Sequence, residues 1–134
     1  MRVCNLFTDA VAPHEDERFD TILSHKNLVI ERIVSSAAIT PQECVQAQDE
    51  WVLLVQGEAI LQLAGESISL KTGDHLFLPA GVPHTVVQTS EGAMWLAIHL
   101  HPEQTIFPKF LDNQLPGKQD KVMLPRQSNK SINR

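Results

Sequence analysis

Between residues 28 and 101, short apolar segments alternate with turn-forming residues at close and even intervals. The breaks include Ala64-Gly65, Thr72-Gly73-Asp74 and Ser90-Glu91-Gly92. β-Branched and aromatic residues favour strands, whereas Gly, Asp and Ser favour the turns between them. The pattern predicts strands at residues 28–34, 51–56, 58–63, 67–70, 75–78, 84–89 and 93–100.

Strands this short and this closely spaced are typical of an antiparallel β-sandwich or barrel, because parallel pairs need long crossover connections. The sequence therefore predicts an all-β fold. We expect residues 1–101 to form a single domain with its core at 28–101, and short irregular extensions at both ends. In the C-terminal extension, 102–134, apolar residues become sparse and we expect it to be partly flexible. A short helix over 103–112 fits the pattern there, although Pro108 opposes it.

Two of the predicted strands differ in how their faces are patterned. Residues 51–55 are apolar on both faces, which predicts that one face lines the interior and the other meets a second sheet or a partner subunit. We therefore expect a homodimer. In residues 84–89, by contrast, His84 and Gln88 share a face with Val86, which predicts a polar patch within an apolar wall.

Composition and charge limit which binding partners and which cellular compartment we expect. The 134 residues suit one domain, and a net charge of -5 argues against a nucleic acid or an anionic membrane surface as partner. No apolar run approaches the roughly 20 residues that span a bilayer, and the N-terminus lacks a signal-peptide pattern. Cys4 and Cys44 are too few for a disulfide framework, so we expect a cytoplasmic protein. Residues 117–134 carry five Lys or Arg against one Asp, which suits either an interaction tail or a solvated terminus.

Residues 73–84 form a turn that can direct a histidine inward. Gly73 and Gly81 permit conformations that a Cβ disfavours, and Pro79 fixes its own φ. Such a rigid turn can aim His84 at the interior of the barrel. Glu50 shares a strand face with Val52 and Leu54, so it is also expected to point inward. A carboxylate and an imidazole inside an apolar barrel are costly unless they bind each other, a metal or a polar ligand.

The order Gly73-x5-Pro79-x-Gly81-x2-His84 resembles the second motif of the cupin superfamily, G-x5-P-x-G-x2-H-x3-N, and departs from it only at Gln88. Upstream, Glu50-x6-Gly57 resembles the end of the first motif, G-x5-H-x-H-x3/4-E-x6-G. The start of that motif is degraded. Ala38 stands in place of its Gly, Cys44 in place of its first His and Gln46 in place of its second His. The resemblance covers residues 38–88 and implies a jelly-roll barrel that pairs with a second copy.

The resemblance also implies a first-row divalent metal, such as Fe, Mn, Zn or Ni, held by the motif residues. Carried over position by position, it leaves Glu50 and His84 as ligands, and Gln46 as a donor of an amide oxygen. Cys44 could bind as a thiolate or be a simple core residue. If His99 faces the cavity, it completes a set of two histidines and one carboxylate. Otherwise His99 is a hydrogen-bonded core histidine and His101 is exposed.

Three functions remain open on this basis. The first is a metal-dependent enzyme acting on a small molecule, of the dioxygenase, isomerase or decarboxylase type. The second is a non-catalytic cupin that binds a small ligand without a bound metal. In the third, Glu50 and His84 only hydrogen-bond each other within a structural barrel. The fold does not select among these functions or name a substrate.

Overall fold

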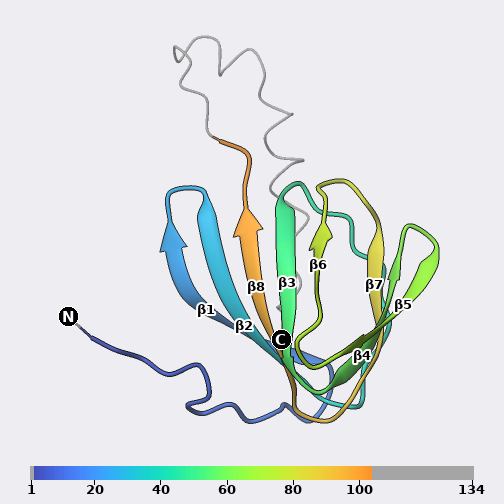
Figure 1. Cartoon of the computed structure of the whole chain (residues 1–134), viewed down its shortest axis with the longest axis horizontal. Helices are drawn as coiled ribbons and strands as arrows, with labels where there is room; N and C mark the ends of the chain where they lie inside the picture. The colour runs from blue at the N-terminus through green and yellow to red at the C-terminus, as the bar shows by residue number, and fades with distance from the viewer. Residues whose placement is uncertain (1, 104–134) are drawn as a thin grey trace.

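The computed structural model describes residues 2–103, and these form two antiparallel sheets without any helix (Figure 1). The five-stranded sheet has the order β1-β2-β8-β3-β6, and the three-stranded sheet has the order β5-β4-β7. The strands are β1 Glu17–His25, β2 Leu28–Ser35, β3 Asp49–Gln56, β4 Glu58–Leu63, β5 Glu66–Lys71, β6 His75–Leu78, β7 His84–Thr89 and β8 Ala93–Leu100. Across the described residues, no helix is long and apolar enough to cross a bilayer.

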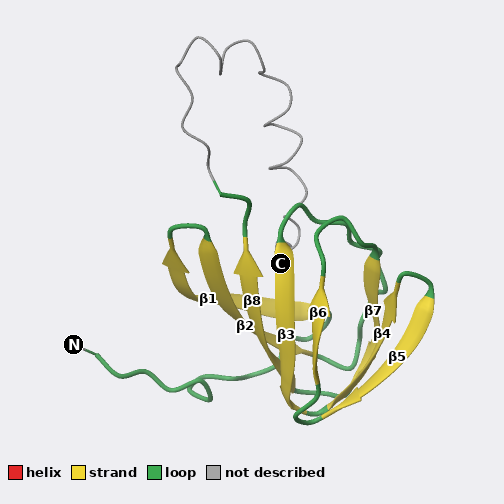
Figure 2. Cartoon of the chain, turned by 45° about the horizontal axis from the view of Figure 1, so that its top comes forward, coloured by secondary structure: helices red, strands yellow, loops and turns green. Residues whose placement is uncertain are grey.

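The hydrophobic core lies between the two sheets, which stand apart at one end and converge at the other (Figures 1 and 2). Both sheets contribute to it through alternate residues, as the period of a strand requires. The buried core residues are Ile33, Val52, Leu54, Ala59, Leu61, Leu70, Leu78, Ala93, Trp95 and Ala97. The predicted all-β, antiparallel fold is therefore confirmed.

All seven predicted strands are present, and their ends differ from the prediction by at most two residues. The turns follow the expected chemistry, since Gly73 and Gly81 have φ of 93° and 80°. The prediction of an irregular N-terminal extension is wrong for β1, which pairs with β2 from Glu17 to His25 with one irregularity between Thr21 and Leu23. This edge strand has polar residues on both faces and no buried position, so its sequence lacks the alternation that marked the other strands. The possible helix at 103–112 and the flexibility of 102–134 fall almost wholly outside the described residues.

The segment before β1 is fixed to the outer face of the five-stranded sheet by arginine side chains. Arg32 is 9% exposed and donates to the carbonyls of Leu6 and Thr8, at 2.8 and 2.6 Å. Its Nη2 also lies 2.8 Å from Asp20 Oδ2, and Arg18 contacts the same carboxylate at 3.1 Å. We call Arg18, Asp20, Arg32 and the carbonyls of residues 6 and 8 the outer network.

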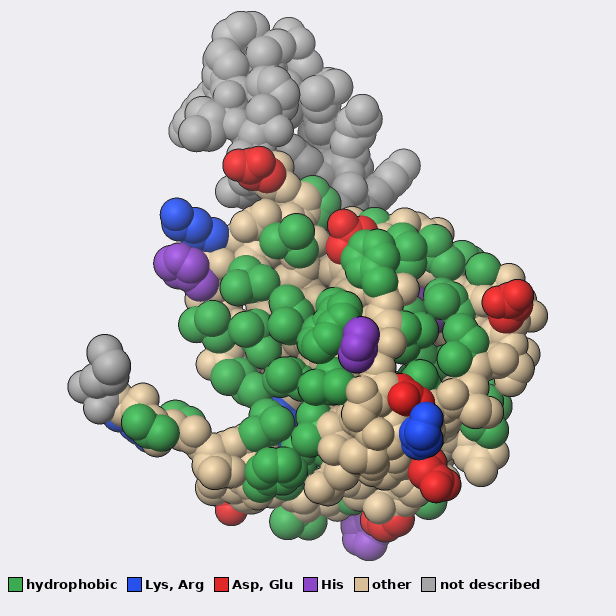
Figure 3. Space-filling view, viewed as in Figure 1, with side chains coloured by type: hydrophobic (Ala, Val, Ile, Leu, Met, Phe, Trp, Pro, Cys, Tyr) green, Lys and Arg blue, Asp and Glu red, His purple; other side chains and the backbone are tan. Residues whose placement is uncertain are grey.

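Only one face of β3 is fully covered within a single chain. Val52 and Leu54 are buried, but Trp51, Leu53 and Val55 on the other face are half-buried. They belong to an apolar surface over the five-stranded sheet (Figure 3). Phe77 of the neighbouring strand β6 is 54% exposed on the same surface. The double burial predicted for this strand therefore needs something outside the chain.

Candidate functional site

Three adjacent strands of the five-stranded sheet place polar side chains inside the barrel at one end. Glu50 of β3 follows the inward alternation of Val52 and Leu54, and His99 of β8 follows that of Trp95. Glu50 and His99 are direct partners in the β3–β8 register. Glu31 of β2 lies one strand further along, on the other side of β8. The sheet therefore brings two carboxylates and an imidazole to the same place.

His99 lies at the centre of this arrangement. Its Nε2 is 3.0 Å from Glu31 Oε1 and 3.8 Å from Glu50 Oε2, and its Nδ1 is 3.2 Å from Gln48 Nε2. Gln46 Nε2 donates to Glu50 Oε1 at 2.9 Å. We call Glu31, Gln46, Gln48, Glu50 and His99 the inner polar cluster. The side chains of Glu31, His99 and Glu50 are 22%, 11% and 9% exposed, and Gln46 and Gln48 are buried.

The two ring nitrogens of His99 have different neighbours. Nδ1 lies 3.2 Å from the amide nitrogen of Gln48, and Nε2 lies 3.0 Å from Glu31 Oε1. Which of the two nitrogens donates is set by the tautomer of the imidazole. The second carboxylate, Glu50, lies beyond hydrogen-bond distance of Nε2. The Nε2 atom of His99 is therefore within hydrogen-bond distance of Glu31 but not of Glu50.

The predicted residue His84 is on β7, in the opposite sheet. Its partner in register is Leu63, which packs on the core, so the His84 side chain is on the inner face. Among the described residues, its ring Nδ1 is 3.3 Å from the carbonyl of Val82. Its backbone pairs with Cys44 through two hydrogen bonds, at 2.8 and 3.0 Å. Direct contacts join Glu50 to both His99 and Gln46, and within residues 2–103 no hydrogen bond or ion pair joins the His84 ring to these three.

The structure also gives the positions of three other candidates, Cys44, His99 and His101. Cys44 is exposed, so the alternative that it is a core residue is wrong, and its Sγ is 3.9 Å from Gln46 Oε1. His99 points inward, as a ligand would, and has partners at both ring nitrogens, as a core histidine would. His101 is half-buried rather than exposed, and its ring stacks on that of His99 with centroids 6.2 Å apart.

Sequence reasoning missed Glu31 and Gln48. A signal existed for Glu31, because it shares a strand face with Val29 and Ile33. The same alternation sends Arg32 to the outside. No comparable signal identified Gln48, which comes from the irregular segment before β3.

The metal implied by the cupin resemblance can be tested against these contacts. In residues 2–103, no three His, Cys, Asp or Glu side chains are arranged to hold an ion. Gln46 turns its amide nitrogen toward Glu50, and both nitrogens of His99 have hydrogen-bond partners. The cluster as arranged does not fit a divalent metal. The ligand set Glu50, His84, His99 and Gln46 stays a prediction.

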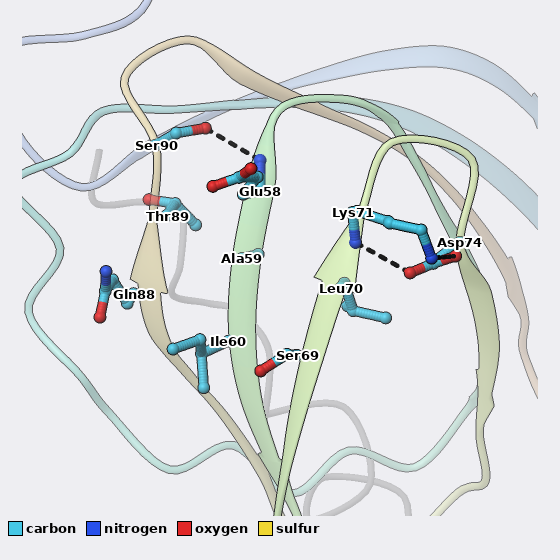
Figure 4. A pocket seen from close by; sticks show the side chains of 10 residues that line it. All are labelled: Glu58, Ala59, Ile60, Ser69, Leu70, Lys71, Asp74, Gln88, Thr89 and Ser90. Carbon is cyan, nitrogen blue, oxygen red and sulfur yellow. Dashed lines mark hydrogen bonds and ion pairs between the residues drawn. The ribbon is translucent and has the colours of Figure 1, made fainter.

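Two hollows in the surface bear on how a ligand could approach. One, of about 390 Å³, lies at the same end as the cluster and is lined in part by Asp49, Leu100 and His101, the sequence neighbours of Glu50 and His99. The other, of about 500 Å³, is shown in Figure 4. Its wall residues Ile60, Ser69 and Gln88 alternate with buried ones, so it lies outside the three-stranded sheet. The smaller hollow is the one at the barrel end of the cluster, and its wall contains His101, whose ring stacks on His99, but no member of the cluster itself.

Comparison with known proteins agrees with this architecture. The family model described as a cupin domain matches residues 37–99. A crystal structure of a "putative mannose-6-phosphate isomerase" from Ralstonia eutropha JMP134 is 34% identical, with a TM-score of 0.66 over 76% of this chain and 100% of that one. The chain belongs to the cupin family.

Other solved cupin-like structures are more distant. The TT1209 protein from Thermus thermophilus is 21% identical with a TM-score of 0.65, over 76% of this cupin and 100% of that chain. An RmlC-like cupin from Shewanella frigidimarina NCIMB 400 is 17% identical with a TM-score of 0.59, over 67% and 84%. At these identities the likeness shows the fold alone. No curated protein sequence is significantly similar to this cupin.

Proposed function

We propose that this cupin binds a small polar organic molecule at the barrel end that contains the inner polar cluster, without needing a resident metal. The observation that carries the proposal is the burial of Gln46, Gln48, Glu50 and His99 together within an apolar core. Burying such groups costs free energy that a purely structural barrel would avoid with apolar residues. The hollow of about 390 Å³ beside His101 supports access to that end.

The arrangement also suits proton transfer. The Nε2 atom of His99 lies 3.0 Å from Glu31 Oε1 and 3.8 Å from Glu50 Oε2, and an imidazole can donate or accept a proton. An isomerase needs a group of this kind to move a proton on its substrate. The printed name of the Ralstonia relative supports an isomerase as the catalytic form of this proposal.

Metal-dependent chemistry is the second candidate function. The cupin family membership and the inward position of Glu50 and His99 support it. It requires Glu31 and Gln48 to release His99, and Gln46 to turn its oxygen inward. A bound Fe, Mn, Zn or Ni ion would then act as a Lewis acid on the ligand.

Elemental analysis and ligand screening separate these functions. The experiment measures the metal content of the purified protein and of His99→Ala and His84→Ala, and the thermal shift of each with a panel of metabolites. We expect no stoichiometric metal, and a stabilising metabolite whose effect is lost in His99→Ala. Near-stoichiometric metal that is lost in both variants would establish the second candidate instead. If no metabolite stabilises the wild type, the binding proposal is wrong.

We further propose a homodimer that buries the apolar outer surface of β3 and β6, in which Phe77 is 54% exposed. The apolar character of this surface supports a second copy as its occupant (Figure 3). The absence of nucleic-acid and membrane partners and the cytoplasmic location remain predictions.

A further inference from the structure

We propose that the segment before β1, residues 2–11, is an arm that packs on the second copy of the chain in the homodimer. This inference rests on the proposed homodimer and specifies a second element through which the two copies meet. It follows from three observations: a row of exposed apolar side chains, an anchor that holds the backbone of this row, and the face of the sheet on which the anchor lies.

The apolar side chains of the arm are largely in water. Val3, Phe7 and Val11 recur at every fourth residue and are 97%, 55% and 70% exposed. Single apolar side chains on a surface are common, but several on one short segment indicate a contact site. Figure 1 shows the arm extending past β1, the edge strand of the five-stranded sheet. The arm therefore offers apolar side chains beyond the body of its own chain.

The backbone of the arm is held in place, so its side chains are exposed in a defined position. Arg32 is 9% exposed and donates to the carbonyls of Leu6 and Thr8. Arg18 donates to two further carbonyls of the arm, at 2.6 and 2.8 Å. Ordering the end of a chain costs conformational entropy. An arm that is already ordered loses less entropy when it docks on a partner.

The anchor lies on the same face of the sheet as the apolar surface of β3 and β6. Arg32 points to this outer face, as Trp51 and Phe77 do. Next to the anchor, Val34 and Met94 are 0% exposed although they alternate with core residues and so face outward. The outer face is therefore covered within one chain near the anchor and open over β3 and β6. A copy of equal size that packs on the open part also reaches the arm.

The distribution of charge favours a second copy as the occupant. Each copy has a net charge of -5, so two copies repel each other unless they meet through uncharged segments. Residues 3–8 of the arm contain no charged side chain, and neither do residues 51–55 of β3. A strongly charged partner would find no counter-charge on either segment. In a two-fold dimer each copy gives one arm and receives one, so the contact is made twice.

Substitutions in the arm of the full-length protein test this contact. Val3→Ser/Phe7→Ser replaces two exposed apolar side chains, and we expect the dissociation constant of the dimer, measured by sedimentation over a concentration series, to rise at least tenfold. Val45→Ser is the matched control, because Val45 is 49% exposed and follows Cys44, which is bridged to β7 of the other sheet. Its dissociation constant should equal that of the wild type. Circular dichroism spectra show whether each variant is folded.

A second measurement shows which copy the arm contacts. A nitroxide spin label is attached to Cys4, which is exposed, in a Cys44→Ser background. This protein is mixed with ¹⁵N-labelled protein that carries no spin label, so any broadening of the ¹⁵N signals arises between copies. We expect broadening of amide signals on the outer face of the five-stranded sheet. The signal of Ser69, on the outer face of the other sheet, should keep its intensity.

An unchanged dissociation constant in Val3→Ser/Phe7→Ser, or an equal rise in Val45→Ser, would overturn the inference. Absence of broadening in the ¹⁵N-labelled copy would do the same, because the arm would then lie on its own chain or in solvent. If Phe77→Lys dissociates the dimer and the arm variant does not, the proposed homodimer stands and this inference fails. A monomeric wild type would refute both and leave the proposed ligand binding unaffected.

Discussion

Glu31 and Arg32 are neighbours on β2, yet their side chains enter opposite faces of the five-stranded sheet and meet opposite electrostatic conditions. In the outer network, the Arg32 guanidinium is matched by two carbonyls and the Asp20 carboxylate. In the inner polar cluster, the imidazole of His99 lies 3.0 Å from the Glu31 carboxylate and 3.8 Å from that of Glu50. The outer network joins two segments of the chain and stabilises the fold, whereas the inner cluster gathers polar groups at the edge of an apolar core, where a ligand can use them.

Among the variants that test this comparison, we expect the largest effect from a substitution in the outer network. Arg32→Leu removes the buried donors of Arg32 and leaves the carbonyls of Leu6 and Thr8, and Asp20, with fewer partners. We expect the free energy of unfolding to fall by about 3 kcal/mol, measured by urea denaturation. Arg2→Leu, at an exposed position, is the control and should change it by less than about 0.5 kcal/mol. A loss below about 1 kcal/mol for Arg32→Leu would show that the network is not structural.

Asp20→Asn tests the other partner of the outer network and should cost about 1 kcal/mol at neutral pH, because a third of the Asp20 side chain is exposed and solvent weakens the pair. Burial raises the pKa of Asp20, but hydrogen bonds and charge from Arg32 and Arg18 outweigh burial and leave it below its usual 3.8. A lowered pKa in the folded state stabilises the protein above the unfolded value and loses that effect as the pH falls through the folded value. The difference between wild type and Asp20→Asn should therefore be constant above about pH 5 and shrink below about pH 4. A difference that grows on acidification contradicts this assignment.

Glu50→Gln tests the inner side, where we expect the stability to change by less than about 1 kcal/mol. The variant removes a buried charge, and its side-chain oxygen can still accept from Gln46. Urea denaturation also measures this change in stability, so the effects of Glu50→Gln and Asp20→Asn can be compared directly. A loss above about 2 kcal/mol would mean that Glu50 supports the fold in the way that Arg32 does.

Phe77→Lys has the smallest expected effect on the stability of a single chain, because Phe77 is 54% exposed on the outer surface. It should instead convert the proposed homodimer to a monomer, as measured by light scattering at micromolar concentration. Lys26→Glu, in the turn between β1 and β2, is an exposed control that should leave the dimer intact. A monomeric wild type would show that the apolar surface is not a homodimer interface.

The fold could be predicted because its signals are local: each strand is marked by its own alternation and each break by its own turn residues. The inward position of Glu50 followed from Val52 and Leu54 on the same strand. The contact between Glu31 and His99 joins residues 68 positions apart, and it depends on β8 lying between β2 and β3. No local pattern encodes that strand order, so the sequence identified the members Glu50 and His99 without their arrangement.

The position of β8 in the sheet order has a consequence for how the protein acquires its site during synthesis. The neighbours β2 and β3 leave the ribosome long before β8, and they are joined across the sheet only when that last strand is inserted between them. Glu31 and Glu50 therefore come together only when the strand bearing His99 arrives. A nascent chain that ends before β8 keeps its two acidic side chains apart and in water, which spares the growing polypeptide an uncompensated repulsion.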